Sequence, residues 1–561
     1  MDDRLIGRRS FVVSGLAGVA CAAAAAAVPR AALAITRGRP GRRIREWQEA
    51  FSNDPLALEE TTIADLQAAM ASGHVSAHAL VEQYFARIDA VDVRGPTLRS
   101  VLERNPDALS IADGLDAERR SGRVRGPMHG IPVLLKDNIA TADRMQSTAG
   151  SLALVGAAVP RDAFIAKQLR SAGAVVLGKA NLSEWANFRS THASSGWSGR
   201  GGQTLNPYAL DRTPSGSSSG SAVAIAANLC AIAVGSETDG SIVSPSAACS
   251  LVGLKPTVGL LSRAGIIPIS HNQDTPGPIA RTVRDAAILL AAMVGPDDRD
   301  PATAASRGRA QADYTIGLDP GGLRGARIGV ARKHFFGYSD VTDRLIADAL
   351  EVMGRQGAVL VDPADIDTAG QFDEAELTVL LYDFKEDLNR YLADLGAGSP
   401  IHTMADAIAF NSAHRDTEMP YFGQELMLQA ETKGPLTDKA YRKALDRCRK
   451  LSRSEGIDRT MDRYRLDAIV APTQGPPWLT DLVNGDPSNQ PGSTTPAAVA
   501  GYPSITVPAG FAFGLPIGVS FMGRPFAEAT LIRLAYAFEQ ATHVRRPPTF
   551  AATADVNTSS H

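Results

Sequence analysis

Glycine and serine residues that could bring the backbone close to another group are concentrated in one stretch, Thr213 to Gly259. It opens with the loop-like sequence Gly216-Ser217-Ser218-Ser219-Gly220, continues as an apolar segment, and reaches a second Gly-Ser pair at Gly240-Ser241. Small residues of this kind leave room for a close approach of the backbone, glycine most of all. We therefore expect the backbone to contact another group closely at both clusters.

A lysine lies upstream of this stretch, in the sequence GIPVLLKDN, where Lys136 ends an apolar run. Burial disfavours the charged ammonium and lowers the pKa of a lysine, which can then act as a base. Taken singly, Lys136 would be a surface lysine, and Ser217 and Ser241 would be turn residues. Only their joint pattern favours a chemical role.

The three pieces together resemble the amidase signature family of serine hydrolases. The family pattern G-x-P-x-x-x-K-D is matched by Gly130 to Asp137, G-G-S-S-G-G-S by Ser215 to Ser221, and D-T-G-G-S-I-R by Glu237 to Val243. The two catalytic serines of the family are 24 residues apart, which is the spacing of Ser217 and Ser241. The resemblance covers nearly the whole mature chain and includes the later sequences VGLKPTVGLLSRAGIIPIS, DTPGPIART and GYPSITVPAGF.

This chain departs from the commonest family pattern at several positions. Glu237 stands for Asp, Asp239 for Gly and Val243 for Arg, while Ser215 and Ser219 replace glycines. The resulting sequence ETDGSIV looks like the branch that contains bacterial peptide amidases, which remove the C-terminal amide of peptides. It looks less like the branches that amidate glutamyl-tRNA or cleave fatty-acid amides.

The resemblance implies a Ser-cisSer-Lys triad. Ser241 would be the nucleophile, neutral Lys136 the base, and Ser217 the relay that passes the proton between them. The peptide bond that enters the middle serine is cis in the family, which here would be Gly216–Ser217. Such a mechanism needs no cofactor and no metal.

The oxyanion donors would be the backbone N–H groups of Thr238, Asp239, Gly240 and Ser241. Asp239 is unexpected there, because a carboxylate beside a developing oxyanion would oppose catalysis. We predict that its side chain points away from the carbonyl, toward a substrate amine or a structural donor.

Two other serine-hydrolase patterns are disfavoured. The sequence around Ser218 matches G-x-S-x-G, the nucleophile elbow of α/β-hydrolases. That motif needs a strand directly before it, whereas Asn206-Pro207 and Thr213-Pro214 indicate a loop, and its late histidine would have to be His543. No S-x-x-K motif is present, so penicillin-binding-type chemistry does not fit.

Composition excludes several other classes. The 561 residues carry a formal net charge of −3 and no basic stripe, so nucleic acid is not an expected partner. The four cysteines are scattered without metal-binding spacing, and a chain of this length needs no disulfide framework. Three histidines near the motifs are not grouped as ligands: His129, His192 and His271.

Residues 1–34 are predicted to be a twin-arginine signal peptide. Arg8-Arg9 is followed by an Ala-rich apolar run and by a small-residue cleavage site at Ala32-Leu33-Ala34. A membrane anchor is the competing interpretation, but Pro29-Arg30 interrupts a short, weakly apolar run. A lipoprotein site at Cys21 is disfavoured, because Gly18 stands where a leucine would be expected before such a cysteine. We expect export by the Tat translocase to the periplasm or the medium, without stable membrane association after cleavage.

The rest of the chain predicts an α/β fold: one large domain with a mixed β-sheet core covered by helices, the amidase signature fold. After an extension at 35–60, the domain spans 61–545. Its first two helices are separated at Ser72-Gly73, and strands are expected at 96–104 and 131–136. The helical region 372–460 would wall the substrate cleft, although ordinary packing is favoured for each of its aromatic residues. Residues 551–561 are predicted to be a disordered tail.

Three functions follow as hypotheses. The first is an exported amidohydrolase that cleaves peptide C-terminal amides through an acyl-enzyme. The second is a broader aryl or alkyl amidase or esterase. The third is a binding protein on an inactive amidase scaffold, suggested by Glu237, Asp239 and Val243.

Overall fold

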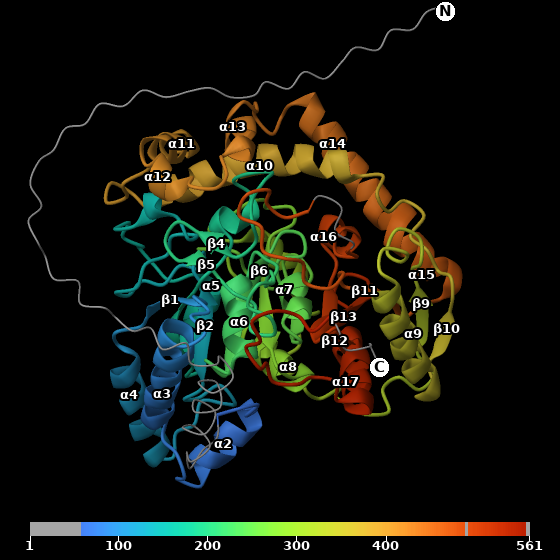
Figure 1. The fold of residues 1–561 in the computed structure, drawn as a ribbon, viewed down its shortest axis with the longest axis horizontal. Helices are drawn as coiled ribbons and strands as arrows, with labels where there is room; N and C mark the ends of the chain where they lie inside the picture. Colours follow the sequence, from blue (N-terminus) through green and yellow to red (C-terminus); the bar gives the residue numbers. More distant parts are fainter. Residues whose placement is uncertain (1–57, 488–491, 557–561) are drawn as a thin grey trace, which may run out of the picture. The chain divides into compact units, whose positions relative to one another are not determined.

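An eleven-stranded mixed sheet lies at the centre of the structure, a computed structural model that describes residues 58–487 and 492–556 (Figure 1). Along the sheet the strands follow the order β1-β3-β2-β6-β8-β7-β12-β13-β11-β9-β10. The strands are β1 Val101–Arg104, β2 Pro132–Lys136, β3 Val175–Ala180, β6 Ile232–Glu237, β7 Val252–Lys255, β8 Thr275–Ala280, β9 Arg327–Val330, β10 Val359–Val361, β11 Ala468–Pro472, β12 Ser504–Ala512 and β13 Leu515–Met522, with a separate pair β4 Trp197–Ser198 and β5 Gly202–Gln203.

Helices cover this sheet, which confirms the predicted α/β fold with a mixed sheet. The α-helices are α2 Ile63–Ala71, α3 Ala77–Arg87, α4 Ala108–Arg120, α5 Phe164–Ser171, α6 Ser219–Ala226, α7 Val243–Ala248, α8 Val283–Met293, α9 Asp340–Arg355, α10 Asp373–Asp394, α11 Met404–Ala413, α12 Arg415–Glu418, α13 Glu425–Glu431, α14 Lys439–Arg449, α15 Asp458–Tyr464, α16 Thr495–Ala500 and α17 Glu528–Thr542. Shorter or irregular helices are η1 Ile88–Arg94, η2 Leu152–Leu154, η3 Glu184–Asn187, η4 Pro301–Ser306 and η5 Lys450–Ile457.

The central strands are buried from end to end. Every residue of β2, β6, β11 and β13 is buried, as expected for strands that helices cover on both faces. β2 is parallel to both of its neighbours, β3 and β6. The carboxyl ends of β2 and β6 therefore meet at the same edge of the sheet, where open α/β sheets place their ligands.

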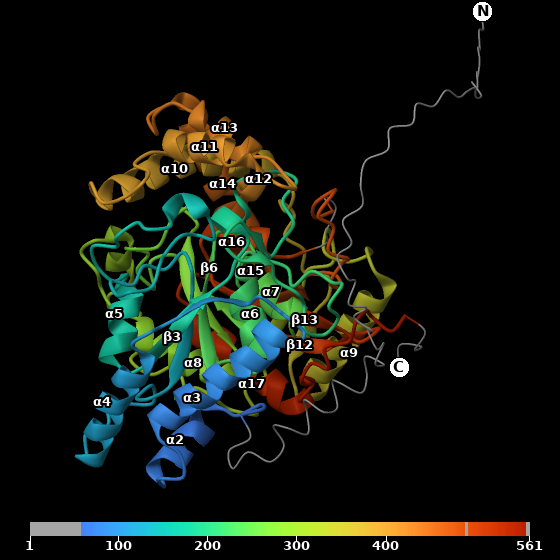
Figure 2. The same cartoon turned by 60° about the vertical axis from the view of Figure 1, so that its left-hand side comes forward.

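The helices of region 372–460 lie together beside this edge (Figure 2). Apolar side chains of α10 pack against buried apolar residues that follow β2 and β3. From α10 these are Phe384, Leu388 and Leu392, and from the body they are Leu154, Leu182 and Trp185. This cluster fixes α10 across the end of the sheet. Within the described residues, no helix is both long and apolar enough to span a membrane.

The first two helices agree with the prediction, but two other boundaries were wrong. The strand expected at 96–104 begins only at Val101, because Thr97 and Arg99 have positive φ angles and the carboxylate of Asp92 accepts the N–H groups of Ser100 and Val101. These hydrogen bonds hold the preceding residues in a turn.

The tail predicted to be disordered is ordered at its beginning. Ala551 forms a parallel bridge with Ala209 and accepts a hydrogen bond from Leu210 N–H, and Ala554 is buried against Ala209 and Leu515. These contacts fix residues 551–554 on the body. The proposed signal peptide, the extension as far as residue 57, and residues 557–561 lie outside the described residues.

A buried arginine joins the body to the helices of region 372–460. The guanidinium of Arg189 pairs with Glu184 and donates to the carbonyl of Glu418, and it lies 4.4 Å from the ring centroid of Phe422. Both partners of the Arg189–Glu184 pair are almost completely buried. Removing one partner of such a pair leaves an uncompensated buried charge.

We therefore predict that Arg189→Met lowers the free energy of unfolding by about 3–5 kcal/mol. The exposed Arg355–Glu351 pair, with an Nη1–Oε1 distance of 2.7 Å on α9, is the matched control, and Arg355→Met should cost less than about 1 kcal/mol. Chemical denaturation of both variants measures the difference. Equal losses in the free energy of unfolding would show that burial does not make the Arg189 pair more important for stability than the exposed pair.

Candidate functional site

Lys136 is the last residue of β2 and has no exposed surface. Its Nζ lies 2.7 Å from Ser217 Oγ and donates to the carbonyl of Ser236 at 3.0 Å. Burial lowers the pKa of Lys136 to about 7, although the carboxylates of Asp274 and Glu237 act in the opposite direction. A substantial fraction of this lysine is therefore neutral near pH 7 and able to accept a proton.

Ser217 lies in the loop that precedes α6. The Gly216–Ser217 peptide bond is cis, as the family resemblance implied. The side chain of Ser217 is fully buried, and its carbonyl accepts a hydrogen bond from Ser183 N–H at 3.1 Å. A Cβ atom at Gly216 would lie 2.4 Å from Ser183 Oγ, so this position has no room for a side chain. The glycine therefore allows the loop to pack closely against Ser183.

Ser241 lies between β6 and α7, and 7% of its surface is exposed. Its carbonyl accepts a hydrogen bond from the N–H of Ser218 at 3.2 Å, so the Ser241 segment contacts the loop that carries Ser217. The fold thus brings the Lys136–Ser217 pair and the Ser241 segment together at the ends of two parallel strands, β2 and β6.

The turn before Ser241 presents backbone donors, and we name residues 238–241 the oxyanion segment. Gly240 has a φ angle of +78°. Among the described residues, none accepts a hydrogen bond from the N–H groups of Asp239, Gly240 or Ser241. Glu237 instead accepts those of Ile242 and Val243, at 2.7 and 3.0 Å. The three preceding N–H groups are therefore unpaired with the described chain, and such donors can bind a developing oxyanion.

The carboxylate of Asp239 accepts a hydrogen bond from Thr494 Oγ1 at 2.5 Å. Thr494 is thus a structural donor of the kind expected for this side chain. Burial raises the pKa of Asp239, and the carboxylate of Asp373 on α10 acts in the same direction. Both effects favour the neutral form, which would oppose an oxyanion less than a carboxylate would.

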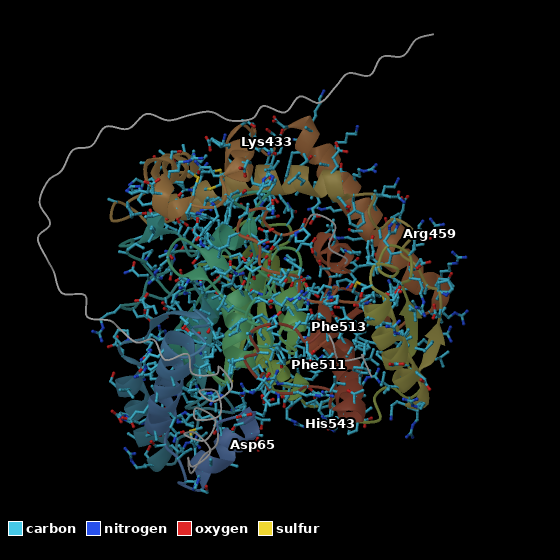
Figure 3. All side chains as sticks on the ribbon, in the orientation of Figure 1. Asp65, Lys433, Arg459, Phe511, Phe513 and His543 are labelled. Atoms are coloured by element: carbon cyan, nitrogen blue, oxygen red, sulfur yellow. The ribbon has the colours of Figure 1, made fainter. Side chains whose placement is uncertain are left out.

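The structure contradicts an α/β-hydrolase site at Ser218. The Ser218 hydroxyl donates to the carbonyl of Ser236 at 3.1 Å, and no strand ends directly before Ser218, because β5 ends at Gln203. His543 lies at the far end of α17, away from Lys433 and the helices of region 372–460 (Figure 3). Among the described residues, the hydrogen bonds of the Ser218 hydroxyl go to the backbone of Ser236 and not to a histidine.

Within the described chain, no three His, Cys, Asp or Glu side chains are grouped to hold a metal ion. The three histidines near the motifs lie in separate surroundings. His129 is buried with Nε2 3.0 Å from the Leu115 carbonyl, while Nδ1 of His192 contacts Thr191 and Nδ1 of His271 contacts Asp387.

A cavity of about 480 Å³ lies next to the lysine and the oxyanion segment. Asn138, Ser236 and Thr238 line one side, and Arg390 and Tyr391 of α10 line another. The region 372–460 therefore does contribute to the wall of a cavity beside the candidate site. Of the other aromatic residues for which ordinary packing was predicted, Tyr382, Phe384 and Phe422 are buried, whereas Tyr421 is exposed.

Several residues near the site were not predicted from the sequence. Ser236 accepts a hydrogen bond from Lys136 through its carbonyl, and Asp274 accepts one from Thr238 Oγ1 at 2.6 Å. Lys255 is fully buried, and burial lowers its pKa to about 8. Lys255 ends the apolar run VGLK just as Lys136 ends its own, so the same signal was available. Asp274 begins the sequence DTPGPIART, to which no role was given.

Known proteins resemble this chain over most of its length. The family model described as Amidase matches residues 79–532. The solved peptide amidase from Stenotrophomonas maltophilia is 53% identical, with a TM-score of 0.84, and the match covers 88% of this chain and 99% of that one. An Arabidopsis thaliana protein named probable amidase is 44% identical, over 89% of this chain and 93% of its own. One component of the glutamyl-tRNA(Gln) amidotransferase of Chloroflexus aurantiacus is 36% identical, over 87% of this chain and 99% of its own.

The surroundings of Lys136 predict how the reactivity of Ser241 depends on pH. If Lys136 must be neutral to accept the serine proton, labelling by a fluorophosphonate probe should increase as the pH rises through about 7 and level off above it. The sign follows because the protonated, inactive lysine dominates below its pKa. Initial labelling rates between pH 5 and 9 measure this.

Lys136→Ala should lower the labelling rate by about 10²- to 10⁴-fold. Lys255→Ala, which removes a second buried lysine, is the matched control and should keep the same pH midpoint. A wild-type rate that is constant from pH 5 to 9 would exclude Lys136 as the base.

Proposed function

The chain belongs to the amidase family, and we propose that it hydrolyses carboxamides through an acyl-enzyme on Ser241, with the C-terminal amides of peptides as preferred substrates. The observation that best supports this proposal is the 2.7 Å contact between the buried Nζ of Lys136 and Ser217 Oγ, beside the Ser241 segment. Support for the substrate comes from the 53% identity to a peptide amidase.

In the proposed first step, Ser241 Oγ attacks the amide carbonyl carbon. Its proton passes to Ser217, whose own proton passes to neutral Lys136 over the 2.7 Å contact. The carbonyl π electrons move to the oxygen, and the N–H groups of the oxyanion segment stabilise the resulting negative charge. Because these donors are held in place before the reaction, they need little reorganisation when the charge develops.

The tetrahedral intermediate then collapses. Lys136 returns its proton through Ser217 to the amide nitrogen, the C–N bond breaks, and ammonia leaves. Water attacks the remaining ester and gives its proton to Ser217, which again passes one to Lys136. Return of this proton to Ser241 Oγ as the C–O bond breaks releases the free acid and restores the enzyme.

A broader amidase or esterase would use the same residues and would differ only in the acyl groups accepted. The binding-protein hypothesis is disfavoured by the geometry, since Lys136 and Ser217 are in contact and the oxyanion segment retains unpaired donors toward the described chain. Glu237 and Asp239, which motivated that hypothesis, have structural partners at the start of α7 and at Thr494.

Ammonia release from four compounds tests the proposed substrate: a peptide C-terminal amide, the same peptide extended by one residue as its free acid, an asparagine side-chain amide, and benzamide. We predict release from the C-terminal amide at a rate at least about tenfold above the others, a difference worth about 1.4 kcal/mol in the barrier. Similar rates with benzamide would indicate a general amidase.

Ser241→Ala should abolish ammonia release and fluorophosphonate labelling together. Ser221→Ala is the matched control, because this buried serine of the same cluster donates to the backbone carbonyl of Val234 and has no proposed catalytic role. Wild-type activity in Ser241→Ala would refute the acyl-enzyme, whatever the substrate.

We further propose that the Tat translocase exports the folded protein to the periplasm or the medium. The support is the Arg8-Arg9 pair, the apolar run and the Ala32-Leu33-Ala34 sequence. Replacing Arg8 and Arg9 together by lysine should retain the protein in the cytoplasm, whereas the unchanged chain should be recovered outside it with Ile35 as its first residue. Cell fractionation and N-terminal sequencing check both points, and unchanged export of the double variant would contradict this route.

A further inference from the structure

Residues 269–274 connect the oxyanion segment to α10, and we name them the strap. On α10, three carboxylates hold the strap: Glu376 accepts from Gln273 Nε2 at 2.8 Å, Asp383 from Ser270 Oγ at 2.6 Å, and Asp387 from His271 N–H at 2.8 Å. Their spacing of seven and four residues places all three on one face of the helix. The strap is therefore anchored along one side of α10.

The other side of the strap holds Thr238, the first residue of the oxyanion segment. The Thr238 hydroxyl donates to Asp274 Oδ1 at 2.6 Å, and the Thr238 carbonyl accepts from Gln273 Nε2 at 3.3 Å. The second oxygen of Asp274 accepts the N–H groups of Ile269 and Ser270, at 2.8 and 2.9 Å. Asp274 thus joins the beginning of the strap to the beginning of the oxyanion segment.

We propose that Asp274 is a positioning residue, which fixes Thr238 and thereby aims the backbone N–H groups of the oxyanion segment at the substrate carbonyl. Two strap N–H groups orient its carboxylate, and the remaining oxygen is fixed on the Thr238 hydroxyl. The segment needs this restraint because its three unpaired N–H groups have no described partner to orient them. Small displacements of oxyanion donors are costly to catalysis.

The position of Asp274 also gives a readout that a merely structural role would not change. Asp274 and Glu237 both raise the pKa of Lys136 against the effect of burial, and Asp274 has the larger effect of the two. Removing its negative charge should therefore lower the pKa of Lys136 and move the acid limb of the pH–rate profile to lower pH. Other charged groups also face Asp274: Lys136 from the end of β2, Asp387 from α10, and Arg263 from the preceding loop. Glu237, which acts on Lys136 in the same direction as Asp274, lies at the end of β6.

This inference rests on the proposed amide hydrolysis, and it is tested with the full mature chain. Asp274→Asn retains the shape of the side chain but removes its charge, and Thr238→Val removes the hydroxyl that Asp274 holds. The readouts are kcat and KM for the peptide amide, the pH profile of kcat/KM, and inhibition by a peptide aldehyde and the corresponding peptide alcohol. Ser241 Oγ adds to the aldehyde to form a tetrahedral adduct whose oxygen needs the oxyanion donors, whereas the alcohol forms none.

We expect Asp274→Asn and Thr238→Val to lower kcat at least about tenfold and to change KM less than about threefold. Aldehyde inhibition should weaken by the same factor as kcat, alcohol inhibition should stay within about twofold, and the acid limb of Asp274→Asn should move to lower pH. Thr238→Ser, which restores a hydroxyl, should recover most of the activity lost in Thr238→Val.

Asp285→Asn is the matched control. Asp285 is a buried carboxylate on α8 that accepts Ile63 N–H, and burial raises its pKa to about 6, as it does for Asp274. This variant should leave kcat and the aldehyde-to-alcohol ratio unchanged, and thermal denaturation checks that all variants are folded.

The positioning role is refuted if folded Asp274→Asn retains wild-type kcat and aldehyde affinity, or if only KM changes. Failure of the proposed substrate looks different. The wild type would then release no ammonia from peptide amides, while the ratio of aldehyde to alcohol affinity would still report whether Asp274 orients the oxyanion segment.

Discussion

The candidate site depends on one buried contact, that between Lys136 Nζ and Ser217 Oγ. A lysine without exposed surface has lost the hydration that stabilises its charge, so burial lowers its pKa to about 7. The 2.7 Å contact then gives the serine a partner that can take or return a proton. Gly216 lets the loop that carries Ser217 pack against Ser183, because a Cβ atom there would lie 2.4 Å from Ser183 Oγ. The presence of a lysine and a serine is not sufficient for this proton transfer, because an exposed lysine would stay protonated near pH 7.

The mixed sheet brings the parts of the site together from distant positions in the chain. Because β2 and β6 are parallel neighbours, the lysine that ends β2 and the segment that follows β6 lie at one edge. Glu237 then turns the chain by accepting the first N–H groups of α7, which leaves the N–H groups of the oxyanion segment without described acceptors. A carboxylate at this position therefore organises the turn through its hydrogen bonds.

The fold class could be predicted from the sequence, because apolar periodicity is a local signal. Lys136, Ser217 and Ser241 were singled out only by their joint resemblance to the amidase signature motifs, since none of the three is distinctive by itself. The strand expected at 96–100 could not be excluded in this way, since it is prevented by the carboxylate of Asp92. Asp274 lacked a local signal too, because its partner Thr238 is 36 residues away and joins it through tertiary structure. Contacts of this kind appear only when the whole sheet is assembled.

The helices of region 372–460 are bound to the candidate site by polar contacts as well as by apolar packing. Phe384 and Leu388 of α10 are buried against the body, while Glu376 and Asp383 on the same helix bond the strap. Since the strap also holds Thr238, a displacement of α10 would act on the oxyanion segment through hydrogen bonds that are fixed in geometry. In the proposed mechanism, a region that lines the cavity and anchors the oxyanion segment would link recognition of a substrate to the alignment of the groups that stabilise its transition state.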